Sequence, residues 1–263
     1  MEEGKVMKNT FKEKIKKAEK PLGTFIDTCS PYVIECVGRT GMDYVIIDNE
    51  HSPVEAETTA QLVRAAELSG ITPLARVREI SRPAVLKLLD VGIQGIIIPN
   101  VSSVEEVQKL VSYAKYKPIG DRGFCPSRKA GWGYDLNMSV PETMNYFNDQ
   151  VLVIPQCETA EALENIEEIV SIDGVDGIFI GPFDLSISMG IPGEFTNPVF
   201  IAAKKRILDA CRSAGKFCML FAGNMDGVLD GYAFGFDSMT YSLDAGLIIQ
   251  CISEKVKEIK EKI

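Results

Sequence analysis

Short apolar runs rich in β-branched residues alternate with longer helical stretches along the 263-residue chain, and this alternation constrains the fold most. The runs are apolar on both faces, as strands covered by helices are. We expect strands at 23–27, 43–48, 73–76, 94–98, 151–157, 176–180, 217–221 and 236–240. We expect helices between them at 31–40, 55–69, 82–91, 103–115, 160–170, 197–214, 225–233 and 243–262.

Eight strand–helix units in about 240 residues predict a TIM (β/α)8 barrel, an α/β fold, forming a single domain over residues 1–263. We expect an N-terminal helix before the barrel and a long irregular loop, residues 117–149, after the fourth strand. This loop suits a lid or a subunit contact, and a variable surface loop is the alternative. A doubly wound sheet is disfavoured because neither a GxGxxG turn after the first strand nor a Walker lysine motif occurs.

Charge and composition exclude several classes of protein. With 28 basic and 37 acidic residues the net charge is −9, which disfavours binding to nucleic acid or an anionic membrane. No apolar run approaches the roughly 18 residues of a membrane span, and the charged start does not read as a signal peptide. The seven cysteines lack CxxC spacing, which favours reduced thiols and a cytoplasmic location.

The chain contains a single histidine, His51. This excludes metal sites built on two or three histidines, so the ligands of any bound metal are mainly oxygens, as magnesium and manganese prefer. No predicted strand carries a lysine, and Lys216 lies before its strand. Schiff-base chemistry is therefore disfavoured, and carbon–carbon chemistry in this barrel would have to be assisted by a metal.

Polar side chains gather where the predicted strands end. In a barrel these positions share one rim, the C-terminal mouth, where active sites lie. The residues are Asp27, Asp48, Asn49, Glu50, His51, Arg76, Asn100, Gln156, Glu158, Asp184, Tyr241 and Asp244.

Two carboxylates, Glu158 and Asp184, follow the fifth and sixth strands and should be neighbours. They would repel each other unless one holds a proton or a cation lies between them. A Mg²⁺-type ion needs only one or two protein carboxylates and leaves positions for substrate and water. The alternative is that each acid lies in the first turn of a helix and stabilises its start. This alternative does not explain why two such acids occur at neighbouring strand ends.

Three further features at this rim have a chemical and a structural interpretation. His51 could carry protons, or be a lone polar histidine. Arg76 could stabilise an enolate or hold a carboxylate, or form an ion pair with Asp48 or Glu50. The turn at residues 181–184 could seat an anion on free backbone N–H groups, or be a plain β-to-α turn.

The sequence resembles the HpcH/HpaI aldolase family over about residues 21–250. The segments that carry this resemblance are YVIIDNEHSP, PLARV, LLDVGIQGIIIP, RGF, VIPQCETAEALENI and GVDGIFIGPFDLSISMG. The family comprises metal-dependent class II pyruvate aldolases, including those for 2-keto-3-deoxy sugar acids and 4-hydroxy-2-oxo-heptanedioate. The resemblance implies reversible cleavage of a 4-hydroxy-2-keto acid to pyruvate and an aldehyde through a metal-stabilised pyruvate enolate.

The resemblance also implies roles for individual residues. Glu158 and Asp184 would bind the divalent cation, Mg²⁺, Mn²⁺ or Co²⁺. His51 would move protons, oriented by Asp48 or, across a subunit contact, by Asp90.

Arg76 would stabilise the enolate oxygen, and Glu50 would help to hold metal-bound water. The substrate site would further include the residues Gln156, Gly181, Pro182 and Phe183, with backbone N–H groups of the turn receiving the substrate carboxylate. Family members are typically hexamers, trimers of dimers, whose mouths are partly built by a neighbouring chain.

Three residues depart from the family pattern. Phe183 replaces a small or polar residue and reshapes the pyruvyl seat, and Asn49 replaces a common glycine. Asp27 adds a negative charge that would repel acidic aldehyde acceptors.

Two other functions stay open. One is a CoA-thioester lyase of the citramalyl- or malyl-CoA type, for which Arg122, Arg128 and Lys129 are the only candidate basic groove. The other is a non-catalytic barrel that binds a keto acid, an alternative kept open by Phe183.

Overall fold

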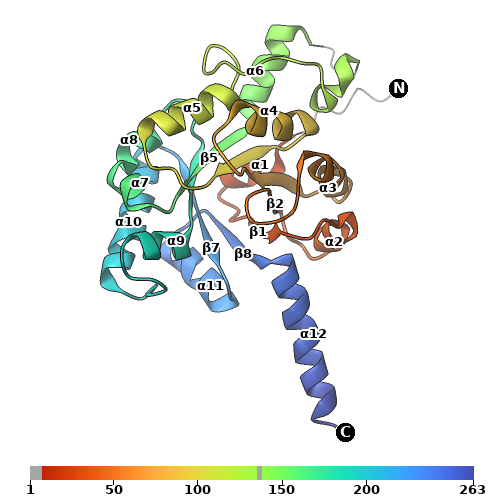
Figure 1. The fold of residues 1–263 in the computed structure, drawn as a ribbon, viewed down its shortest axis with the longest axis vertical. Helices are drawn as coiled ribbons and strands as arrows, with labels where there is room; N and C mark the ends of the chain where they lie inside the picture. The colour runs from red at the N-terminus through yellow and green to blue at the C-terminus, as the bar shows by residue number, and fades with distance from the viewer. Residues whose placement is uncertain (1–7, 135–137) are drawn as a thin grey trace.

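Eight parallel strands close into a barrel in chain order, with β8 pairing back onto β1 (Figure 1). The computed structural model describes residues 8–134 and 138–263. The strands are β1 Leu22–Ile26, β2 Tyr44–Asp48, β3 Thr72–Arg76, β4 Gly95–Ile98, β5 Leu152–Cys157, β6 Gly177–Ile180, β7 Phe217–Ala222 and β8 Ser238–Leu243. The predicted TIM barrel is confirmed, and each predicted strand overlaps an observed one.

Helices surround the barrel and connect its strands. They are α1 Thr10–Lys16, α2 Pro31–Val37, α3 Ala56–Leu68, α4 Arg82–Val91, α5 Val104–Ala114, α6 Val140–Gln150, α7 Ala160–Glu164, α8 Ile166–Ser171, α9 Pro182–Ser188, α10 Pro198–Ser213, α11 Met225–Phe234 and α12 Asp244–Lys260. Side-chain caps set several starts: the Ser103 hydroxyl accepts from Glu106 N at 3.3 Å, and Asn197 Oδ1 accepts from Val199 N at 2.9 Å. The single helix predicted at 160–170 is divided into α7 and α8 at Asn165, whose side chain donates to the Glu161 carbonyl.

Apolar side chains form two main layers of core. The larger fills the space between the sheet and the outer helices. The smaller fills the barrel interior, where the Phe11 ring of α1 packs edge-on against Tyr44 at 4.9 Å and Phe217 at 5.6 Å. Tyr44 and Phe217 begin β2 and β7, so α1 plugs the N-terminal end of the barrel. The opposite end, where the strands terminate, is left as the mouth.

The predicted loop at 117–149 is only partly irregular. It contains the 3-10 segment η1 Arg128–Gly133 and the helix α6, whose capping box joins Ser139 and Glu142. Residues 135–137 of this loop lie outside the described residues. The segment follows α5 and ends at β5, so it lies at the N-terminal end of the barrel (Figure 1). The lid interpretation is therefore wrong for the mouth of its own chain, whereas a subunit contact stays a prediction.

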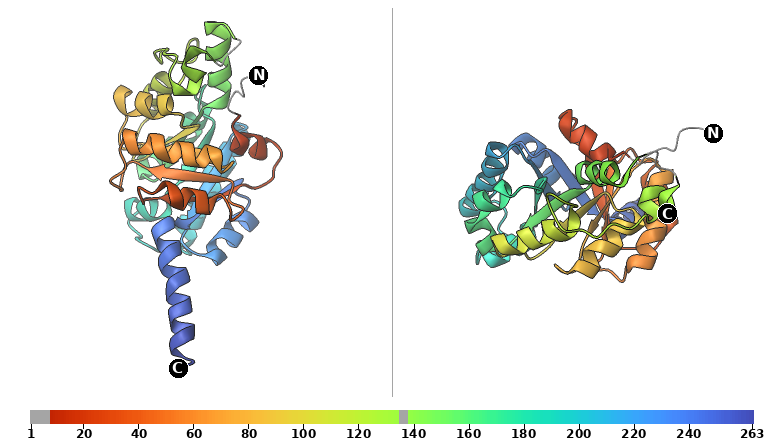
Figure 2. Two further views of the ribbon diagram at one scale, coloured as in Figure 1. Left: turned by 90° about the vertical axis from the view of Figure 1, so that its right-hand side faces the viewer. Right: turned by 90° about the horizontal axis from the view of Figure 1, so that it is seen from above.

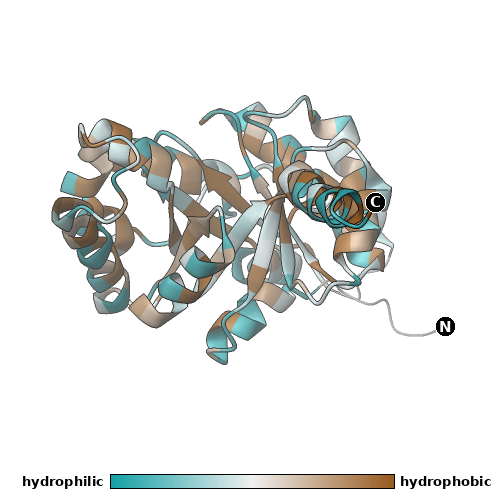
Figure 3. Ribbon diagram, turned by 90° about the horizontal axis from the view of Figure 1, so that it is seen from below, coloured by the Kyte–Doolittle hydropathy of each residue, from teal (hydrophilic) through white to brown (hydrophobic). Residues whose placement is uncertain are grey.

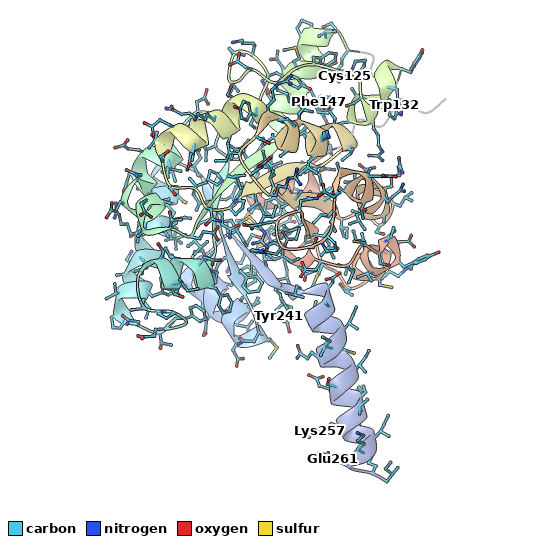
Figure 4. The ribbon with its side chains drawn as sticks, viewed as in Figure 1. Cys125, Trp132, Phe147, Tyr241, Lys257 and Glu261 are labelled. Atoms are coloured by element: carbon cyan, nitrogen blue, oxygen red, sulfur yellow. The ribbon has the colours of Figure 1, made fainter. Side chains whose placement is uncertain are left out.

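The last helix, α12, projects away from the barrel instead of packing along it. In Figure 2 it extends from one end of the molecule, opposite the η1–α6 region. Tyr241 of β8 lies at its base and Lys257 and Glu261 near its free end (Figure 4). Viewed along its axis, the helix carries both polar and apolar residues (Figure 3). Its exposed apolar side chains are Ile248, Ile249, Ile252, Val256 and Ile259.

No helix among residues 8–134 and 138–263 is long and apolar enough to cross a membrane. The sequence predicts no signal peptide at the N-terminus. Residues 1–7 of that segment lie outside the described residues.

Candidate active site

A cavity of about 290 Å³ opens at the carboxyl ends of the strands. Most of the polar residues predicted to share this rim do line it or lie beside it. Its lining comprises Phe25, Asp27, Asp48, His51, Arg76, Gln156, Phe179, Gly181, Pro182, Phe183, Asp184, Phe221 and Leu243.

One side of the mouth is built by β2 and β3, where a buried ion pair joins neighbouring strand ends. Asp48 and Arg76 are register partners, and the guanidinium donates from Nε to Asp48 Oδ1 at 2.9 Å and from Nη2 to Oδ2 at 2.6 Å. The Arg76 guanidinium also lies 4.8 Å from the centre of the Phe25 ring. Burial alone would lower the pKa of Arg76, but the hydrogen bonds and charge of Asp48 raise it overall. This arginine is a fixed, permanently charged donor facing the mouth.

Glu50 and His51 continue this side beyond β2. Glu50 Oε2 lies 3.2 Å from Arg76 Nη1 and 3.6 Å from His51 Nε2, yet it accepts no hydrogen bond from the described residues. Burial raises the pKa of Glu50, while the charges of Arg76 and His51 oppose that rise. The His51 side chain is 68% exposed and can reach a ligand in the mouth.

The other side of the mouth is built by β5 and β6, and its central group is the buried Glu158 carboxyl, 3% exposed. Glu158 Oε1 accepts a 2.7 Å hydrogen bond from the backbone N of Asn100, which lies two residues beyond β4 in a left-handed conformation with φ of 52°. The Gln156 amide donates to the other oxygen of Glu158. Burial raises the pKa of Glu158 to about 7, and the charges of Asp184 and Glu50 add to the rise.

The turn after β6 brings Asp184 to the same side. Gly181 caps α9, and a Cβ at this position would collide with the Glu158 carboxylate and the Gln156 amide. Only glycine therefore fits between β6 and the carboxylate. Pro182 has no N–H, so the free donors of the first helical turn at the mouth are those of Phe183 and Asp184.

Glu158 and Asp184 are carboxylates, the type of ligand that a divalent cation such as Mg²⁺ prefers. No group of three or more His, Cys, Asp or Glu residues in the described part of the chain is arranged to hold an ion. An Mg²⁺-type ion, however, requires only one or two protein carboxylates. A carboxyl whose pKa is raised by burial and by the charges of neighbouring carboxylates is an environment that a cation would relieve.

Asp90 is the predicted site residue that the structure does not bring to this mouth. It lies near the end of α4, at the N-terminal side of the barrel, and accepts from Arg122 Nη2 at 2.8 Å. Its predicted role across a subunit contact stays a prediction. Asp48 engages Arg76, so within this chain His51 has Glu50 as its nearest carboxylate.

Sequence reasoning gave no role to two residues that shape the mouth. Asn100 tolerates the left-handed conformation that aims its N–H at Glu158, which is a known preference of asparagine. Asp244 is buried and accepts from the backbone N atoms of Asp27 and Thr28, at 3.0 and 3.2 Å, so it joins the ends of β8 and β1. The position of Asp244 after the last strand predicts that it lies at the rim. No pattern in the sequence predicts its hydrogen bonds to Asp27 and Thr28.

The family model of the HpcH/HpaI aldolase/citrate lyase family matches residues 22–242. The chain belongs to this family. The match covers the barrel as far as Ser242 and every residue that lines the mouth except Leu243, and it confirms the resemblance seen in the sequence.

Relatives and solved structures agree. The chain is 30% identical to the 2-keto-3-deoxy-L-rhamnonate aldolase of Escherichia coli strain K12 over 97% of this chain and 94% of that protein. The crystal structure of an HpcH/HpaI aldolase from Desulfitobacterium hafniense is 28% identical, with a TM-score of 0.88 over 95% of this chain and 96% of that chain. The citrate synthase SbnG is 29% identical, with a TM-score of 0.86 over 95% of this chain and 97% of that chain.

The chain is therefore an enzyme, a metal-dependent class II aldolase of the lyase type. None of the eight described strands contains a lysine that could form a Schiff base inside the barrel. Aldolases of this class generally use a divalent cation.

The alternative functions have weaker support. The citrate lyase β subunit of Mycobacterium tuberculosis shares 17% identity with a TM-score of 0.57, which shows the fold alone. The basic groove expected for CoA is not formed, because Arg122 pairs with Asp90, Arg128 pairs with Glu67, and Lys129 is buried.

Proposed function

We propose that this enzyme reversibly cleaves a 4-hydroxy-2-keto acid to pyruvate and an aldehyde at the mouth of its barrel. The observation that carries the proposal is the buried carboxyl of Glu158, whose pKa is raised by burial and by the charge of Asp184, beside a mouth that Asp184 and Arg76 line. The likeness to a 2-keto-3-deoxy-L-rhamnonate aldolase supports the same class of substrate.

Glu158 and Asp184 would hold the divalent cation, Mg²⁺, Mn²⁺ or Co²⁺. When bound, the cation would stabilise the negative charge that develops on the 2-keto oxygen. Gln156 and the Asn100 N–H fix the Glu158 carboxylate from behind, so its position does not depend on the substrate.

The substrate would be oriented by fixed donors. Arg76, held by Asp48, faces the mouth and would stabilise the same developing charge as a permanently charged donor. The N–H groups of Phe183 and Asp184 would receive the substrate carboxylate, and Gly181, which has no Cβ, leaves room for the Glu158 carboxylate and the Gln156 amide beside the turn.

In the cleavage direction the C3–C4 bond breaks and its electron pair stays on C3, which then takes up a proton to give pyruvate. His51 would accept the proton of the 4-hydroxyl as C4 becomes the aldehyde carbon. Glu50, 3.6 Å from His51 Nε2, would orient the ring within the chain, and Asp90 of a neighbouring copy would do so in an assembly.

Steady-state release of pyruvate from a panel of 4-hydroxy-2-keto acids tests the proposal. We expect turnover with Mn²⁺ or Mg²⁺, its loss in EDTA, and its recovery when the metal is added back. Metal-independent turnover would contradict the site, and no turnover with any panel member would contradict the reaction. A thermal shift with CoA would instead favour the CoA-thioester alternative.

We further propose a cytoplasmic homohexamer, a trimer of dimers, in which residues 1–263 form one aldolase domain. The exposed apolar side chains of α12 support an assembly, because a monomer rarely leaves such a stripe uncovered. Light scattering coupled to size exclusion would detect a mass of six chains, and a monomeric mass would contradict the assembly.

A further inference from the structure

Asp27, which directly follows β1, places in the mouth a carboxylate that the proposed reaction does not use. Its backbone N donates to Asp244 Oδ1 at 3.0 Å, so the position of the residue in the rim is fixed. Its side chain, in contrast, is half-buried and has neither a hydrogen bond nor an ion pair with any residue of 8–134 or 138–263. This carboxylate is therefore available to a ligand in the mouth.

The aldehyde half of the substrate would lie on the same side of the mouth as Asp27. In the proposed reaction the substrate carboxylate binds at the turn after β6, and the 4-hydroxyl donates to His51, beyond β2. These two strands lie opposite each other in the closed barrel, so the substrate spans the mouth. β1 pairs with β2, with Ile26 as the register partner of Ile47, so Asp27 lies beside the end of β2. A substituent on C4 therefore starts beside the wall to which Asp27 belongs.

This wall carries an excess of negative charge. Its guanidinium, Arg76, is already bound by Asp48 and approached by Glu50 at 3.2 Å. Burial and the charges of Asp48 and Asp244 raise the pKa of Asp27, and the charge of Arg76 opposes that rise. A positively charged group beside Asp27 would relieve this repulsion, whereas a negatively charged group would add to it.

The mouth also presents aromatic rings to a cation. Phe25, two residues before Asp27 and on the same face of β1, lines it together with Phe221 of β7, and the centres of the two rings are 6.0 Å apart. The Arg76 guanidinium lies 4.8 Å from the centre of the Phe25 ring, so a ring of this mouth already contacts one positive charge. Alkylated ammonium groups bind well to ring faces. The rings and the unpaired carboxylate thus favour the same kind of ligand.

We propose that Asp27 determines the specificity of the enzyme by binding a positively charged substituent on the aldehyde half of the substrate, an ammonium group close to the aldehyde carbon. The inference rests on the proposed aldolase reaction and specifies its acceptor. A neutral acceptor would leave the charge of Asp27 uncompensated, and an acidic acceptor would be repelled.

Two substrates of matched shape test the proposal: the 4-hydroxy-2-keto acids formed from pyruvate with trimethylammonioacetaldehyde and with tert-butylacetaldehyde. They differ only in whether a positively charged nitrogen or a neutral carbon carries the three methyl groups, and neither has an amine that could condense with the keto group. We expect kcat/KM for cleavage of the cationic substrate to exceed that of the neutral one by at least about tenfold, the effect of one partly buried charge pair.

Asp27→Asn should bring this ratio close to one. The carboxylate that it removes has no partner among the described residues, so the variant should fold, which circular dichroism checks. Asp173→Asn is the matched control. It removes the same charge from an exposed position between α8 and β6, at the other end of the barrel, and should keep the wild-type ratio.

Equal kcat/KM values for the two substrates in the wild-type enzyme, or an unchanged ratio in Asp27→Asn, would overturn the role of Asp27 alone. Failure to cleave either substrate would do the same if other 4-hydroxy-2-keto acids are cleaved. Failure to cleave any 4-hydroxy-2-keto acid would overturn the proposed reaction and this inference with it.

Discussion

The two sides of the mouth balance charge in opposite ways. On the β2–β3 side, Asp48 and Arg76 satisfy each other through two hydrogen bonds. On the β5–β6 side, the Glu158 carboxyl is also buried, but its hydrogen-bond partners are only an amide and a backbone N–H. The charges of the neighbouring carboxylates further raise its pKa.

The difference indicates which side is complete without a ligand. A buried ion pair with bidentate geometry holds its shape by itself, so Arg76 is positioned before the substrate arrives. Carboxylates crowded in a buried site are stable only with a proton or a cation. The β5–β6 side therefore has the properties of a receptor for a cation, and the β2–β3 side those of a preorganised scaffold.

Removing a carboxylate from the receptor side should have the largest effect. Glu158→Gln and Asp184→Asn should each lower metal-dependent kcat/KM by at least about 10³-fold, because the cation that stabilises the developing charge would be lost. Calorimetry with Mn²⁺ should show no binding, while circular dichroism shows a folded barrel. Glu161→Gln, an exposed acid of α7, is the control and should keep both properties. Normal turnover in either site variant would contradict the comparison.

Breaking the scaffold side should instead reduce stability. Asp48→Asn removes the bidentate partner of the Arg76 guanidinium, 12% exposed, and leaves it only Glu50 at 3.2 Å, so the free energy of unfolding should fall by about 3 kcal/mol. Glu55→Gln removes the exposed pair with Arg78 and should change it by less than about 1 kcal/mol. Denaturant unfolding of the metal-free proteins measures both. Equal effects in the two variants would show that the Asp48–Arg76 pair contributes no more to the free energy of unfolding than an exposed surface pair.

Much of the fold was predictable because the barrel repeats one simple pattern. Each strand is an apolar run between turn residues, and signals such as Asn197 and Gly92 mark helix boundaries directly. The α6 helix is not predicted, although Ser139 and Glu142 form a capping box, because the segment is among the most polar of the helices and follows a run of glycines that favours a loop. The outward course of α12 had no local signal, since its amphipathic pattern is the same whether or not the helix packs on its own barrel.

The candidate site was predictable in composition but not in pairing. Strand ends place Asp48, Arg76, Glu158 and Asp184 at one rim. In the structure Asp48, Arg76 and Asp184 line one mouth, and Glu158 is buried beside it, close enough to Asp184 for their charges to interact. The sequence could not show that Asp48 binds Arg76 instead of His51, because that choice depends on side-chain geometry between adjacent strands.

The pH dependence of stability should also differ between the two sides. Because burial raises the pKa of Glu158 to about 7, the folded metal-free protein binds this proton more tightly than the unfolded chain does. Stability should therefore fall as pH rises from about 4.5 to 7, by roughly 2 to 3 kcal/mol in total. Asp27 and Glu50, whose pKa values are also raised by burial, contribute with the same sign. Glu158→Gln should remove the largest part of this slope, and an unchanged profile would contradict the raised pKa.

Glu50 tests whether the two sides are separable, because it lies between them. Its side chain approaches Arg76 at 3.2 Å, and its charge also raises the pKa of Glu158. Glu50→Gln loses an attraction to Arg76 but also removes a poorly solvated charge, so the free energy of unfolding at pH 7 should change by less than about 1 kcal/mol. The midpoint of the Glu158 titration in the stability profile should move to lower pH, because one repelling charge is gone. A loss above about 2 kcal/mol with no shift of that midpoint would instead place Glu50 wholly within the ion-pair scaffold.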